Sequence, residues 1–111
     1  MSNQFKRGVE LYLNANVRPQ ISRVECGLRT ICRIGNIYMT PSVNSLISNS
    51  SAIIAQDEQS IRALESLCSR CYNADQLKRE VSTFCRSRVR TCGGANQSMN
   101  KLRSVLLMLV K

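Results

Sequence analysis

Arginine is the residue type in this sequence that points most clearly to a chemical role. The chain has 111 residues, with 16 basic and 7 acidic side chains and a formal net charge of +9. Twelve of the basic residues are Arg and four are Lys. The planar guanidinium offers five donors in a fork that matches phosphate oxygens, whereas the Lys ammonium is a compact point charge. The excess of Arg therefore favours a polyanionic partner, and nucleic acid is the partner that we expect.

The arginines form two rows when each helix is given its turn of about 100° per residue. One row lies on a helix predicted over residues 19–38, beside its apolar face, and the other lies on a helix predicted over residues 75–92, opposite its apolar face. The rows consist of Arg18, Arg29 and Arg33 on the first helix and of Arg79, Arg86 and Arg90 on the second. We expect these six side chains to form the nucleic-acid-binding site.

The spacing within the rows suits a phosphate backbone. Both rows end in Arg-x3-Arg, and four or seven residues of helix span about 6 Å or about 10.5 Å. Two such helices side by side would present a basic plate. A plate cannot reach bases in the deep, narrow major groove of duplex RNA, but it can follow the backbone and the 2′-hydroxyls across the shallow minor groove. The pattern predicts sequence-independent binding of duplex RNA.

The opposing interpretation is that the rows are ordinary solvated faces of amphipathic helices. A surface of that kind tends to place acids three or four residues from its bases. Apart from Asp75, which is expected to cap the second helix, Glu25 and Glu80 are the only acids on the two helices. This scarcity of compensating charge favours the binding interpretation.

Six cysteines give the second possible chemistry. A structural zinc ion needs four ligands, and Cys68, Cys71, Cys85 and Cys92 could supply four thiolates. A disulfide framework is a second possibility, because Cys26-x5-Cys32 followed by Cys-x2-Cys partly resembles the six-cysteine helical saposin-like proteins that act on membranes. The spacing and order of the other cysteines do not fit that family.

The third interpretation, which we favour, is that most of these thiols are small buried hydrophobes. Cys68, Cys71, Cys85 and Cys92 all fall on apolar helix faces, as that interpretation requires. Cys26 differs because it falls on the polar side of its helix near Arg33, where we expect an exposed thiol.

Catalytic machinery is missing from the sequence. The chain has no His, so neither a Ser-His nor a Cys-His couple can form. No G-x-x-x-x-G-K-[ST] phosphate loop occurs, and the acids form no pair suited to acid–base chemistry. We therefore expect a protein that is not an enzyme, binds no cofactor or metal, and takes no small-molecule substrate.

Hydrophobic spacing places these residues on an all-α fold, a compact bundle of five or six short amphipathic helices in a single domain over residues 1–111. A first helix is predicted over residues 3–16, and Pro19 is expected to begin the second. Thr40-Pro41 signals the next start, a break is favoured near Asp57, and Asp75 is expected to cap the following helix.

The last helix is apolar on nearly all sides, which is typical of a helix that is deeply buried or packed against another subunit. We expect an interface with a partner, such as a second copy of the chain, at residues 105–110 and name five of them as candidates. They are Val105, Leu106, Leu107, Met108 and Leu109. This run is too short to span a bilayer, and residues 1–8 contain no apolar stretch of signal-peptide length. We therefore expect an intracellular, cytoplasmic protein in a reducing compartment, with no membrane partner.

In size, charge and helical content the chain is similar to the small duplex-RNA-binding proteins with which nodaviruses suppress RNA silencing. The likeness is limited to these overall properties, so no residue role follows from it. The chain is compatible with a viral or a eukaryotic source. The alternative from another class is a helical adaptor for an acidic protein, with the last helix as anchor and the arginines as steering charges.

Overall fold

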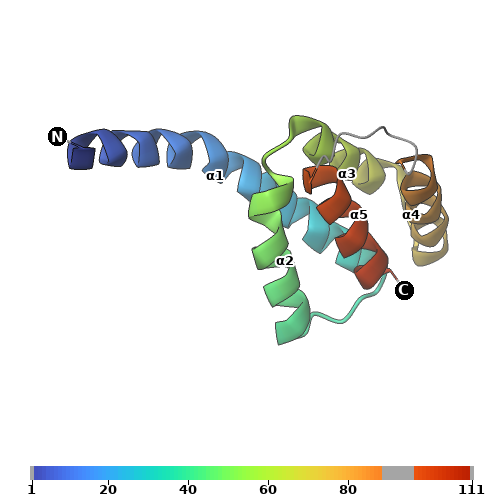
Figure 1. Ribbon diagram of the computed structural model, residues 1–111. Coiled ribbons are helices and arrows are strands. Elements are labelled where there is room, and N and C mark those ends of the chain that lie inside the picture. The colour runs from blue at the N-terminus through green and yellow to red at the C-terminus, as the bar shows by residue number, and fades with distance from the viewer. Residues whose placement is uncertain (1, 89–96, 111) are drawn as a thin grey trace.

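The structure is a computed structural model that describes the backbone of residues 2–88 and 97–110 and the side chains of residues 18–86 and 97–110. Within these ranges it contains five helices and no strand. The helices are α1 (Ser2–Ile34), α2 (Pro41–Ile54), α3 (Glu58–Arg70), α4 (Ala74–Arg88) and α5 (Gln97–Leu109). Figure 1 shows α2 to α5 gathered around the C-terminal half of α1, so the expected all-α bundle is confirmed.

Helix α1 differs from the prediction, because residues 3–16 and the helix after Pro19 form one helix of 33 residues. Proline removes one hydrogen bond to the carbonyl four residues earlier, but its fixed φ is itself helical. That carbonyl belongs to the half of α1 that projects from the bundle (Figure 1), where water can bond to it. The buried side chains of Val24, Leu28 and Ile31 anchor the C-terminal half.

The C-terminal end of α1 also comes earlier than the predicted residue 38. Asn36 has φ 55°, and the Ile37 N–H donates to the Cys32 carbonyl at 2.8 Å. The Asn36 N–H donates to the Arg33 carbonyl at 3.3 Å. These two bonds form a Schellman motif, which satisfies the last carbonyls of a helix with a left-handed residue just beyond it.

Capping side chains define the starts of the next helices. Thr40 Oγ1 accepts from the Val43 N–H at 3.1 Å, with Pro41 in the first turn as predicted. Asp57 Oδ1 accepts from the Gln59 N–H at 3.3 Å, which confirms the break between α2 and α3 near this residue. The prediction that Asp75 caps α4 is wrong. Asn73 Oδ1 accepts from the Gln76 N–H at 2.8 Å, because α4 begins one residue before Asp75.

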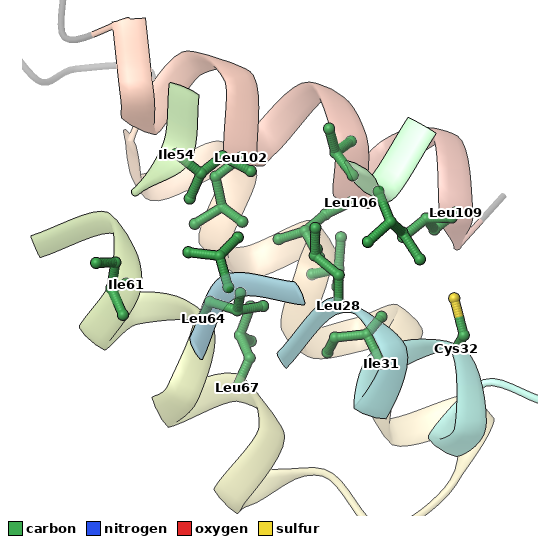
Figure 2. Close-up of a cluster of buried hydrophobic side chains, with 14 of the residues drawn as sticks. Leu28, Ile31, Cys32, Ile54, Ile61, Leu64, Leu67, Leu102, Leu106 and Leu109 are labelled. Atoms are coloured by element: carbon green, nitrogen blue, oxygen red, sulfur yellow. The ribbon is translucent and has the colours of Figure 1, made fainter. Parts of the chain in front are cut away.

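All five helices contribute to one aliphatic core. Figure 2 shows Leu28 of α1, Leu64 of α3 and Leu102 of α5 in the same cluster. The largest fully buried side chains are Val24, Leu28, Ile31, Ile47, Ile54, Ile61, Leu64, Leu67, Leu77, Leu102, Val105 and Leu106. A core of Leu, Ile and Val follows from a sequence with 5% aromatic residues and no Trp.

A close helix contact in this core joins α1 and α3 at Gly27. A Cβ atom at Gly27 would lie 2.8 Å from Leu64 Cδ2 and 2.9 Å from Leu64 Cγ, closer than packed carbon atoms come. Leu64 is fully buried, so a shift of its side chain would disturb the packing around it. The absence of a side chain at residue 27 therefore allows α3 to lie directly against α1.

This contact predicts that Gly27→Val lowers the free energy of unfolding by about 1–3 kcal/mol through overpacking, despite the better helix propensity of Val. Leu64→Ala alone should cost about 2–5 kcal/mol through the cavity that it leaves. Urea unfolding of the two single variants and the double variant checks the contact. The double variant should cost less than the sum, and simple additivity would contradict the predicted clash.

Candidate nucleic-acid interface

The first arginine row lies on the solvent-facing side of α1. Arg18, Arg29 and Arg33 are all exposed. Arg23 and Gly27 mark the side that faces α3, and Arg29 lies about 120° around the helix from Arg23. The row therefore faces away from α3. It borders the buried side of α1, at the edge of that side that is farthest from α3.

The second row is described only in part. Arg79 and Arg86 of α4 are exposed, whereas Leu77 and Val81 on the opposite side of the helix are buried. Arg90, the third expected member, lies outside the residues that the structure describes.

The two rows lie on helices that meet near one end, whereas the expected basic plate requires helices that lie side by side. The C-terminal half of α1 packs against α2 and α3, and α4 meets α1 at its C-terminal end. A Cβ atom at Gly35 would lie 3.1 Å from Leu77 Cδ2, which places this contact at the start of α4. The sequence predicted the faces of the helices but not their order around α1. The α1 row and the α4 row are therefore two separate basic surfaces.

The five described arginines of the rows are free of ion pairs, while acids elsewhere on the bundle are engaged. Arg23 donates to Glu65 at 2.7 Å and to Glu58 at 3.1 Å, and Arg70 Nε lies 3.5 Å from Glu80. Among the described side chains, these are the ion pairs present, and they leave out Arg18, Arg29, Arg33, Arg79 and Arg86. Their guanidinium groups consequently keep their donors available for an external anion.

The Arg23 cluster shows that the chain uses one arginine for folding. The hydrogen bond from Arg23 is the main reason that the pKa of Glu65 lies below the ordinary carboxyl value, against the opposing effect of partial burial. The same hydrogen bonds from Glu65 and Glu58 raise the pKa of Arg23. The role of Arg23 has no signal in the local sequence, because its two partners lie 35 and 42 residues away in the chain.

Helix α2 contributes a polar surface that the sequence analysis did not consider. Its 14 residues contain no charged side chain, although charged residues make up 21% of the whole sequence. The exposed side is mostly Ser and Asn, at Ser42, Asn44, Ser45, Ser48 and Asn49. Because α2 packs along α1, this neutral hydrogen-bonding surface introduces no acid beside the first arginine row.

The described cysteines are free thiols, and burial explains their chemistry. Burial raises the pKa of Cys68 to about 11 and also raises the pKa values of Cys32, Cys71 and Cys85. A raised pKa favours the neutral thiol, the form that packs as a small hydrophobe. The thiol of Cys68 donates to the Gly27 carbonyl at 3.3 Å.

The remaining cysteine predictions have different outcomes. Cys26 is exposed, as expected from its position on the polar side of α1. No group of three or more metal-ligating side chains occurs among the described residues. Cys92, the fourth thiol of the zinc hypothesis, falls outside the described ranges.

The five residues of the expected α5 interface are divided between the core and the surface. Val105, Leu106 and Leu109 are buried in the core of their own chain, so they are not open to a partner. Leu107 and Met108 point away from the core and are 48% and 57% exposed. An apolar pattern on all sides of a helix cannot distinguish burial by its own chain from burial by another.

Comparison with known proteins identifies no relative of this chain, because no family model, curated protein or solved structure matches it. In the described parts of the chain, no helix has both the length and the apolar character needed to cross a bilayer.

The Arg23 cluster predicts a pH-dependent contribution to stability. Because the folded-state pKa of Glu65 lies below its ordinary value of 4.5, this contribution is complete above that value and is lost as the pH falls through the lower, folded-state pKa. Glu65→Gln should therefore flatten the loss of stability between about pH 5 and about pH 3. Urea unfolding across this range checks the effect. Glu25→Gln is the control, because Glu25 is in none of the ion pairs above. Equal acid sensitivity of wild type and Glu65→Gln would exclude the predicted coupling.

Proposed function

We propose that this protein is a non-enzymatic nucleic-acid-binding protein that recognises the phosphate backbone of duplex RNA, independently of sequence, through exposed arginines on α1 and α4. One observation supports this most strongly. Five arginines of the two rows are exposed and unpaired, while Glu58, Glu65 and Glu80 are engaged by other arginines. Each exposed guanidinium can therefore displace condensed counterions from a phosphate without first breaking an ion pair.

Recognition of backbone and shape follows from the surface that carries these arginines. The rows lie on the outer surfaces of helices, and a helix does not fit into the deep, narrow major groove of an RNA duplex. Arg forks can bind phosphates along the strands, and the neutral Ser and Asn side chains of α2 can exchange hydrogen bonds with 2′-hydroxyls. We also propose that the protein works in an intracellular, reducing compartment. Its likeness to viral silencing suppressors is one of size, charge and helical content.

The proposal predicts that the double variant Arg29→Gln, Arg33→Gln weakens binding to duplex RNA. Each lost phosphate contact should reduce the slope of log affinity against log salt by about one. Anisotropy with labelled duplexes of about 20 base pairs, at about 50 and 200 mM salt, measures this. Duplex DNA and single-stranded RNA are the comparison ligands. The free energy of unfolding should change by less than about 0.5 kcal/mol, because both side chains are exposed.

Arg23→Gln is the matched control, since it also removes positive charge from α1. It should lower stability through loss of the Glu58 and Glu65 contacts and leave the salt slope unchanged. Weak binding by wild type, equal for all three nucleic acids, would reject the proposed function.

The exposure of Leu107 and Met108 supports a second candidate, a helical adaptor or self-associating protein that uses this part of α5. Exposed apolar side chains mark many protein–protein contacts. In this case the arginines would steer an acidic partner, and nucleic acid would bind weakly.

A contact between two copies at this surface makes a separate prediction. Sedimentation velocity should then show wild type shifting to a dimer as concentration rises, with Leu107→Ser, Met108→Ser remaining monomeric. Ser104→Ala is the control because it changes an exposed residue of the same helix. A wild type that stays monomeric throughout would exclude self-association through these residues.

A further inference from the structure

Because α1 continues through Pro19 as one helix, arginine positions from both of its halves are aligned along one side of it. Arg7, Arg18 and Arg29 are separated by 11 residues each, and all three positions lie within α1. Eleven residues make three turns plus about 20°, so the three positions follow nearly the same line along the helix. Two helices meeting at Pro19, as the sequence suggested, would not have fixed this alignment.

The distances along this line are long compared with the bundle. Each 11-residue step rises about 16.5 Å, so positions 7 and 29 are about 33 Å apart. The whole of α1 is about 50 Å long at 1.5 Å per residue, close to the 55 Å longest dimension of the molecule. Figure 1 shows the N-terminal half of α1 projecting beyond the other helices, so position 7 lies outside the bundle.

We infer that the projecting half of α1 is a second part of the duplex RNA interface, in which Arg7 repeats, three turns earlier, the phosphate contacts of Arg18 and Arg29. This inference rests on the proposed function and extends the interface from the bundle to the full length of α1. Contacts at fixed intervals along a straight line suit a rigid, uniformly charged rod.

Neighbouring charges on α1 make the register testable. Lys6 carries the same charge as Arg7, but its position is rotated by about 100° from the line. Glu25 lies close to the line between Arg18 and Arg29 and is half-buried. The line thus contains one acid that should repel the same phosphates.

The decisive experiment compares Arg7→Ala with Lys6→Ala in the full chain. Arg7→Ala should weaken binding to a duplex RNA of about 20 base pairs by about fivefold and reduce the salt slope by about one. Lys6→Ala should change the affinity by less than twofold. Glu25→Gln should strengthen binding, and circular dichroism should show unchanged helix content, because Ala is a good helix former.

Duplex length provides a second readout. An RNA duplex of about 8 base pairs is shorter than the 33 Å line, so it can bind at Arg18 and Arg29 without reaching position 7. Arg7→Ala should therefore have little effect on this short duplex.

The outcomes separate this inference from the proposed function. Equal weakening by Arg7→Ala and Lys6→Ala, or equal effects of Arg7→Ala on both duplex lengths, would overturn the register while leaving nucleic-acid binding intact. A wild type without salt-dependent binding to any of the nucleic acids would remove the proposed function, and this inference with it.

Discussion

The close contact between α1 and α3 at Gly27 determines which side of α1 faces solvent. With no side chain at this position, Leu64 packs directly on the α1 backbone, and the Cys68 thiol bonds to the carbonyl of Gly27 itself. One turn earlier, Arg23 reaches across to Glu58 and Glu65 of α3. The steric contact and the ion pairs together fix the rotation of α1 about its axis. Because all other faces follow from that rotation, the exposure of Arg18, Arg29 and Arg33 is a consequence of how α3 docks.

The distribution of acids reinforces this arrangement. An exposed ion pair contributes little to stability, because water and salt screen it. The Arg23 cluster is half-exposed and stabilises the fold modestly, and it also neutralises two carboxylates of α3 that would otherwise repel a polyanion. The pairing of Glu80 with Arg70 does the same on α4. Among the described residues, five exposed arginines thus contribute to the net charge of +9 with their donors free. Such a surface gains energy from a polyanion and little from its own chain.

Sequence periodicity predicted local features of this fold better than it predicted contacts between helices. The all-α class, the start at Thr40-Pro41 and the break at Asp57 depend on nearby residues, and the structure agrees with all three. The predicted separation of two helices at Pro19 failed because tertiary packing decides it. Tertiary packing also decides which apolar residues of the last helix are exposed. Leu28 and its buried neighbours hold α1 in place after Pro19, and the core covers Leu106 but not Leu107. A helical wheel gives the direction in which a side chain points. Only the three-dimensional fold shows whether the core or solvent lies in that direction.

Continuity also explains how the projecting half of α1 can be helical without packing along its length. Forming the first turn of a helix is unfavourable, whereas each later residue adds one hydrogen bond to a helix that already exists. The buried half of α1 supplies such a helix, and the projecting half extends it past Pro19 at the cost of a single hydrogen bond. The extension has the same helical phase as the buried half, so the rotation fixed at Gly27 is transmitted to positions that lie outside the bundle. The core packing of α3 against α1 thereby sets the orientation of a surface that it does not touch.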